Sequence, residues 1–258
     1  MTQQNSTHKG IYLLPNLLTT AGLFSGFYAI VASMKGEFEP AAVAILVAMI
    51  FDGLDGRVAR MTNTQSKFGA EYDSMADIVS FGVAPALVAF NWGLSSLGKI
   101  GWLASFIFVA CAALRLARFN VQASNTDKRY FQGLASPAAA AVIASMVWAG
   151  VEFSIVGHDW NIAVAVVTVL LGLLMVSNFR YSSFKEIEWK GKVSFVVILA
   201  VVLIFALVAA RPAEVLFTVF ALYAVSGPIT TFRTEKKIKL EHVIGDDQDA
   251  DFDQPKDK

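Results

Sequence analysis

Long apolar stretches alternate with short polar segments along most of this 258-residue chain. A helix needs roughly 20 apolar residues to cross a hydrocarbon core of about 30 Å. Eight stretches reach about that length, and they are too long and too uniformly apolar for the strands of a membrane barrel. We expect membrane helices near residues 12–33, 40–60, 70–92, 97–117, 134–155, 161–178, 192–210 and 213–231. The pattern predicts an all-α fold, a polytopic bundle of about eight transmembrane helices.

The polar ends of the chain divide it into three parts. We expect a short cytoplasmic segment at 1–11, a transmembrane domain at 12–232 and a cytoplasmic tail at 233–258. The first apolar stretch lacks a small-x-small cleavage site, so we interpret it as a retained helix and not a signal peptide. The tail is rich in aspartate and has little to bury, which predicts disorder.

The positive charges indicate an orientation. With eight spans, all but three of the 21 lysine and arginine residues fall on the side that holds both termini; the exceptions are Lys35, Lys99 and Arg211. Because positive loops are retained in the cytoplasm, both termini are predicted to be cytoplasmic. The link between the second and third spans, residues 61–68, then lies at the cytoplasmic face of the inner membrane.

Overall charge and cysteine content exclude some classes of function. The formal net charge is zero, which argues against a nucleic-acid partner. The single cysteine, Cys111, lies in a predicted span and excludes an internal disulfide. We interpret it as a packing residue.

The second and third spans carry four aspartates near their cytoplasmic ends: Asp52 and Asp55, then Asp73 and Asp77. With about 100° per helical residue, the members of each pair share one face. The short polar link makes the two helices antiparallel neighbours, so the faces can converge. Since carboxylates inside a membrane are costly, four together predict a functional site.

The chemistry of that site follows from its residue types. Four carboxylates at close range repel one another unless cations are present. Ligand sets made only of oxygen favour Mg²⁺ or Mn²⁺ over zinc, and two such ions can hold a phosphate. Gly56 and Gly69 leave space for a ligand, and Arg60 supplies a cation for phosphate oxygens.

The alternative is a purely structural role. The acids could form interhelical salt bridges with Arg57, Arg60 and Lys67, while the glycines serve as helix-packing contacts. Four acids against three bases, with Arg57 turned away from the shared face, would leave negative charge uncompensated. We therefore favour the metal site.

The complete spaced pattern resembles the signature of the CDP-alcohol phosphatidyltransferases. It matches at every position, in the order Asp52-x2-Asp55-Gly56-x2-Ala59-Arg60-x8-Gly69-x3-Asp73-x3-Asp77. The resemblance implies that an alcohol attacks the lipid-side phosphate of CDP-diacylglycerol and that CMP leaves. It also implies membrane lipids as surroundings and a homodimer.

The resemblance assigns roles to individual residues. It implies that Asp52 and Asp73 bridge two metal ions, and that Asp55 and Asp77 each complete the ligand shell of one ion. Asp77 would also be the general base toward the incoming hydroxyl. The residues that would contact the CDP moiety are Gly56, Arg60 and Ser66.

The acceptor is indicated by segments in and around the signature. Over roughly the first 140 residues, they resemble the branch of the family that uses L-serine. These segments are Leu14 to Thr19, Phe51 to Gly56, Ala76 to Pro85, Leu114 to Asn120 and Gly133 to Pro137. Ala135 is a departure, because many relatives carry proline there. Branches with phosphorylated acceptors commonly carry arginine at the position of Gly22, so its absence disfavours glycerol phosphate and inositol phosphate.

Four further residues have two interpretations each. Arg115 and Arg118 could be orientation signals or snorkelling anchors, or they could hold an acceptor carboxylate or a lipid phosphate. The need for a cation opposite the carboxylate of serine slightly favours the second. Asn16 and Thr19 could cap the first helix, whereas the resemblance places them near the nucleotide.

A rival hypothesis from another class is a cation carrier or channel, because intramembrane aspartates also mark ion pathways. Such a protein would distribute its acids through the depth of the membrane. The clustering of all four near one surface disfavours it.

Overall fold

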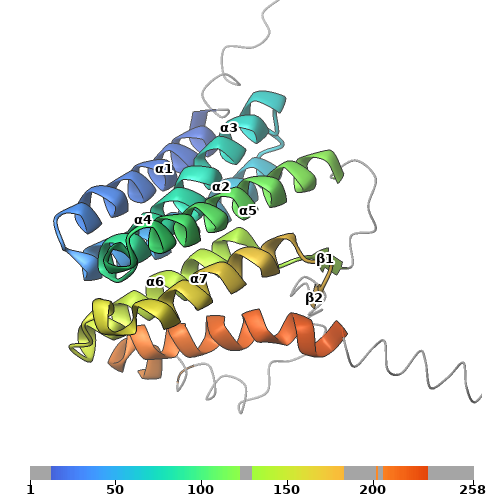
Figure 1. Cartoon of the computed structure of the whole chain (residues 1–258). Coiled ribbons are helices and arrows are strands. Elements are labelled where there is room, and N and C mark those ends of the chain that lie inside the picture. The colour runs from blue at the N-terminus through green and yellow to red at the C-terminus, as the bar shows by residue number, and fades with distance from the viewer. Residues whose placement is uncertain (1–12, 123–129, 183–201, 203–205, 232–258) are drawn as a thin grey trace, which may run out of the picture.

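The computed structural model describes residues 13–122, 130–182, 202 and 206–231 (Figure 1). Within them, the chain is helical apart from two short strands. The α-helices are α1 (Leu13–Met34), α2 (Phe38–Met61), α3 (Lys67–Asp77), α4 (Ala84–Trp92), α5 (Lys99–Gln122), α6 (Ser136–Glu152) and α7 (Asn161–Val176). The remaining elements are η1 (Ile78–Val83), η2 (Leu94–Leu97), η3 (Gly157–Trp160), β1 (Tyr130–Gln132) and β2 (Arg180–Ser182). We call the helix Pro212–Thr231 the C-terminal helix.

Five stretches of the described chain are helical, long and apolar enough to cross a membrane. They are Leu13–Met34, Lys67–Trp92, Lys99–Val121, Gly157–Val176 and Pro212–Thr231. α6 is apolar but shorter, and α2 is not among the five. The prediction of an all-helical, multi-pass membrane protein is therefore confirmed. The predicted span at 192–210 lies mostly outside the described residues, as does the tail at 233–258, so the number eight and the placement of the termini stay predictions.

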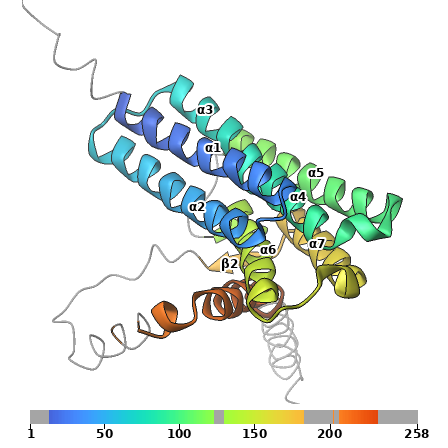
Figure 2. The same cartoon turned by 90° about the vertical axis from the view of Figure 1, so that its left-hand side faces the viewer.

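α1 and α2 form an antiparallel hairpin, and α3 lies beside it (Figures 1 and 2). The helices approach closely because most of the buried residues of α1 and α2 are small, among them Gly22, Ala29, Ala41 and Ala48. In Figure 1, α6 and α7 lie between this hairpin and the C-terminal helix; Figure 2 shows that α6 is next to α2, whereas α7 lies beside α5. The end of α2 and the start of α3, which flank the polar link, lie close to the start of α1.

The third predicted span is not one regular helix. Between α3 and α4, residues Ile78–Val83 form the π-helix η1. Pro85 has no backbone N–H to continue the regular pattern, and the N–H of Ala84 reaches back to the carbonyl of Val79. The wider turn buries Ser80, whose Oγ donates to the carbonyl oxygen of Gly22 at 3.2 Å. A π-helix, often found at functional sites, thus begins directly after Asp77.

Candidate active site

Three of the four signature aspartates converge at the ends of α2 and α3. Ligand oxygens of Asp52, Asp55 and Asp73 all lie within 4.8 Å of one another. Asp55 is 4% exposed, whereas Asp52 and Asp73 are half-buried. The prediction that the two helical faces converge is therefore confirmed for these three residues.

Asp77 lies one turn beyond Asp73, as the last residue of α3. It lines a small cavity of about 10 Å³ to which Asp52, Asp55 and Asp73 also contribute. Its carboxyl group interacts electrostatically with the other aspartates and with Arg115. Asp77 thus connects the aspartate cluster to a cation on α5, although it is not one of the three residues in the close group.

No described cation neutralises the cluster at salt-bridge distance. Among the described residues, the only ion pair within 4 Å joins Arg211 to Glu214. Arg57 and Arg60 are exposed. The interhelical salt bridges of the alternative interpretation are therefore not formed there, and a close set of carboxylate oxygens fits a hard divalent cation.

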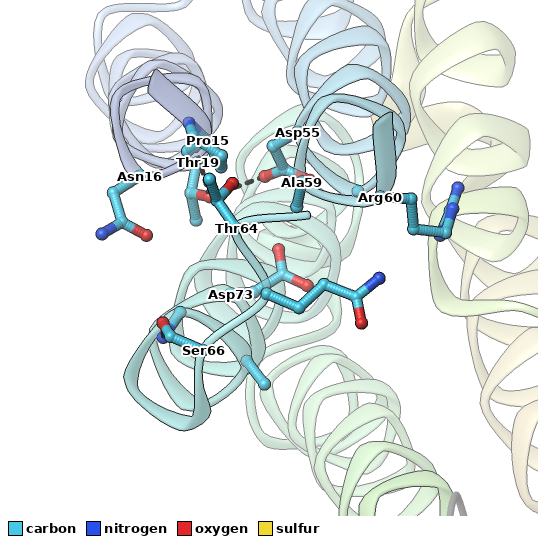
Figure 3. A pocket seen from close by; sticks show the side chains of 13 residues that line it. Pro15, Asn16, Thr19, Asp55, Ala59, Arg60, Thr64, Ser66 and Asp73 are labelled. Atoms are coloured by element: carbon cyan, nitrogen blue, oxygen red, sulfur yellow. Dashed lines mark hydrogen bonds between the residues drawn. The ribbon is translucent and has the colours of Figure 1, made fainter. Parts of the chain in front are cut away.

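α1 contributes a hydrogen-bond donor to the cluster. Thr19 is 5% exposed, and its hydroxyl donates to Asp55 Oδ2 at 2.7 Å (Figure 3). Its Oγ1 also lies 3.1 Å from the carbonyl oxygen of Pro15. Asn16 and Thr19 both lie inside α1, so their interpretation as helix caps is wrong. The bond instead orients the carboxyl group of Asp55 through its Oδ2.

Replacing Thr19 by valine is expected to lower the affinity for Mg²⁺ or Mn²⁺ about tenfold, because groups that orient a metal ligand affect affinity by about 10–100-fold. Calorimetric titration of the purified protein with the metal measures this. Thr20→Val is the matched control, since its hydroxyl bonds to Asn16 and Tyr72 and not to the cluster. Equal affinities in the two variants would contradict this role for Thr19.

A polar pocket of about 230 Å³ adjoins the cluster (Figure 3). Its walls come from the start of α1, the end of α2 and the start of α3. The lining residues are Pro15, Asn16, Thr19, Asp55, Gly56, Ala59, Arg60, Thr64, Gln65, Ser66, Gly69, Ala70 and Asp73. Ser66 caps α3, its Oγ accepting from the N–H of Gly69 at 2.9 Å. The start of a helix favours anionic groups, so this wall suits a phosphate.

The two signature glycines have different surroundings. A Cβ on Gly69 would lie 3.1 Å from Ser66 Oγ and 3.4 Å from Asn16 Oδ1, so this position is tightly confined. A Cβ on Gly56 would meet only Arg60 Nη1, at 3.6 Å. In Figure 3 the side chain of Arg60 points away from Asp55 and Asp73.

The pocket also contains residues that the sequence did not single out. Pro15 falls only within the segment Leu14 to Thr19, and Thr64 and Gln65 only within the polar link. The polarity of residues 61–68 was the available signal, but it does not tell which members of a loop turn toward a site.

Arg115 and Arg118 lie three residues apart on α5 but have different partners. Arg115 Nη1 donates to Ser136 Oγ at 3.0 Å, and the guanidinium interacts electrostatically with Asp77. Its Nε is buried and has no hydrogen-bond partner among the described residues. Arg118 donates instead to Gln132 and Asn178. Arg115 is therefore the arginine associated with the aspartate site.

Residues 12–171 match the family described as CDP-alcohol phosphatidyltransferase. This chain belongs to that family. The matched CDP-alcohol phosphatidyltransferase segment contains all four aspartates and every pocket residue. The C-terminal helix lies beyond it.

Several curated relatives are also similar to this chain. A CDP-diacylglycerol–serine O-phosphatidyltransferase of Helicobacter pylori (strain ATCC 700392 / 26695) is 40% identical over 219 residues, which cover 85% of this chain and 91% of the relative. A protein of the same name from Saccharomyces cerevisiae is 40% identical over 52% of this chain and 53% of its own length. An archaetidylserine synthase of Methanothermobacter thermautotrophicus is 35% identical over 65% of this chain and 69% of its own length.

Proposed function

We propose that this protein transfers the phosphatidyl group of CDP-diacylglycerol to the hydroxyl of L-serine, which gives phosphatidylserine and CMP. The observation that carries the proposal is the group of three carboxylates beside a polar pocket. It occurs in a chain 40% identical, over 85% of its length, to a relative named for this reaction.

The family and the aspartate cluster indicate a divalent metal. We propose two ions, Mg²⁺ or Mn²⁺, held by Asp52, Asp55, Asp73 and Asp77. Bound cations of this kind would neutralise the charge of the phosphate oxygens and make the phosphorus more susceptible to attack. The close spacing of three carboxylates and the lack of a described lysine or arginine within salt-bridge distance support this assignment.

The pocket beside the cluster is the proposed site of the CDP group. Asn16, Ser66 and the N–H groups at the start of α3 offer hydrogen bonds to phosphate or nucleotide. Gly56 leaves room for them, Gly69 lines the same pocket at a position too confined for a side chain, and Arg60 lies at the rim with its charge available in solvent. Thr19 acts through Asp55, to which it donates.

The acceptor is proposed to enter from the side of Asp77 and Arg115. The hydroxyl oxygen of serine forms a bond to the phosphorus that carries the diacylglycerol, and the bond from this phosphorus to the bridging oxygen breaks. CMP departs with that oxygen, and the hydroxyl proton passes to the carboxylate of Asp77. Arg115 would bind the serine carboxylate, because its Nε has no other described partner.

The setting of the site is part of the proposal. The distribution of lysine and arginine supports a position at the cytoplasmic face of the inner membrane, with both termini on that side. The division into an N-terminal segment, a transmembrane domain and a tail is proposed as the sequence suggests. The homodimer that the resemblance implies stays a prediction.

An acceptor comparison tests the function. The purified protein, in detergent with CDP-diacylglycerol and Mg²⁺ or Mn²⁺, is expected to release CMP when L-serine is added. Glycerol 3-phosphate and inositol phosphate are expected to support no release above background. Release driven by glycerol 3-phosphate and not by serine would overturn the choice of acceptor. Metal flux into vesicles without any CMP release would favour the cation-carrier hypothesis.

A further inference from the structure

The guanidinium group of Arg118 makes hydrogen bonds to residues outside the aspartate cluster. Its Nη2 donates to Gln132 Oε1, and to Asn178 Oδ1 at 2.8 Å. Its Nη1 donates to the backbone carbonyl of Val176 at 3.5 Å. Val176 is the last residue of α7, where unpaired carbonyls favour a cation. Both terminal nitrogens of Arg118 are therefore occupied by protein acceptors.

These acceptors belong to the two segments that fix the start of α6. Gln132 ends β1, and Asn178 precedes β2, which pairs with β1 in antiparallel register. The N–H of Gly133 donates to the carbonyl of Phe179 at 2.9 Å, and the N–H of Leu134 donates to that of Leu174 at 3.0 Å. The chain from Gln132 to the first residue of α6 is thereby tied to the end of α7.

Gly133 is required for this path. It has a φ of +79°, in the left-handed region, and a Cβ there would collide with the backbone of Met175. The conformation of Gly133 thus fixes the path of the chain from β1 to the first turn of α6.

The first residue of α6 is Ser136, and it carries the contact to Arg115. Ser136 is buried, and its Oγ accepts from Arg115 Nη1. The side chains of both arginines extend from α5 to the segment from Gln132 to Ser136. Arg118 contacts the first residue of this segment, and Arg115 contacts the last. A shift of Gln132 relative to α5 would displace Ser136 and, with it, the guanidinium beside Asp77.

We propose that Arg118 is a positioning residue: it holds Gln132 and Asn178 so that Ser136 places Arg115 for the acceptor. This inference rests on the proposed function, because it assigns Arg115 to the carboxylate of serine. It gives the two arginines of α5 different roles. Arg115 binds the acceptor, and Arg118 acts through the protein.

The test compares the two sides of the Arg118 contact by steady-state kinetics with CDP-diacylglycerol and L-serine. Arg118→Ala and the double variant Gln132→Ala/Asn178→Ala are each expected to raise KM for serine about three- to tenfold, as for loss of hydrogen bonds to a charged group. KM for CDP-diacylglycerol is expected to stay within about twofold, again on the scale of such a contact. Arg57→Ala, an exposed arginine on α2, is the matched control.

Combining the substitutions separates positioning from direct binding. If Arg118 acts through Gln132 and Asn178, the variant that combines all three substitutions has a KM for serine no higher than that of Arg118→Ala alone. If Arg118 contacts serine itself, Arg118→Ala has a much larger effect than the partner variant, and the effects add, which overturns the inference. An unchanged KM for serine in Arg118→Ala also overturns it. A wild-type protein that releases no CMP with serine refutes the proposed function, and this inference with it.

Discussion

Replacing Asp77 by asparagine is expected to lower kcat for phosphatidyl transfer by about 10²- to 10⁴-fold, the range typical for removal of a general base. Asparagine keeps the shape of the side chain but cannot accept the hydroxyl proton. Because Asp77 does not line the pocket proposed for the CDP group, binding of the nucleotide substrate should change little. Single-turnover assays with CDP-diacylglycerol and serine measure the first effect, and titration with a CDP-lipid measures the second.

Two further variants complete this experiment. Glu71→Gln removes an exposed carboxylate from the same helix and is expected to retain wild-type activity. Asp52→Asn removes a member of the close group, so it should weaken metal binding as well as turnover. Wild-type turnover in Asp77→Asn would refute the role of Asp77 as base.

Replacing Gly26 by alanine is expected to destabilise the protein by ~1–3 kcal/mol, the usual effect of overpacking a tight contact. A Cβ at Gly26 would lie 2.6 Å from Ser80 Oγ and 2.7 Å from Ser80 Cα. Since the second atom belongs to the backbone, a side-chain rotation cannot relieve the clash. α1 and η1 must separate, which also disturbs Asp77 next to η1. A lower melting temperature in detergent, together with reduced turnover, is the expected result.

Gly22→Ala is the matched control on the same helix. Its Cβ would lie 3.6 Å from the nearest atoms, Ala48 O and Phe51 Cβ, which is ordinary van der Waals contact. We expect its melting temperature to stay close to that of the wild type. If the two alanine variants melted at the same temperature, the close approach of Gly26 to η1 would be wrong.

The spacing of Gly22 and Gly26 shows what periodicity can supply. Four-residue spacing of small side chains predicts a helix-packing face, and the structure places both glycines there. It does not say which of the two is in the tighter contact. That difference depends on η1, which turns Ser80 toward α1, and the sequence signal for η1 was limited to Pro85.

The two arginines of α5 show a similar limit. Three-residue spacing predicts that Arg115 and Arg118 share a face of their helix. The side chains of both arginines do extend from α5 to residues of other elements. Their partners, Ser136 for one and Gln132 and Asn178 for the other, are distant in the sequence. No local pattern could assign the two side chains to different contacts.

The sequence by itself determined the membrane class, the approximate helices and the aspartate pairs, because apolar length and helical periodicity are local properties. It also predicted that the four aspartates of α2 and α3 would converge, since a short link forces the two helices to be neighbours, and this is confirmed for Asp52, Asp55 and Asp73. Only the tertiary structure decided that Thr19 donates to Asp55, that Asp77 interacts with Arg115 as well as with the other aspartates, and that Arg118 is occupied elsewhere. Those facts depend on how α1, α5 and α6 pack around the pair, and such packing joins residues that no short stretch of sequence relates.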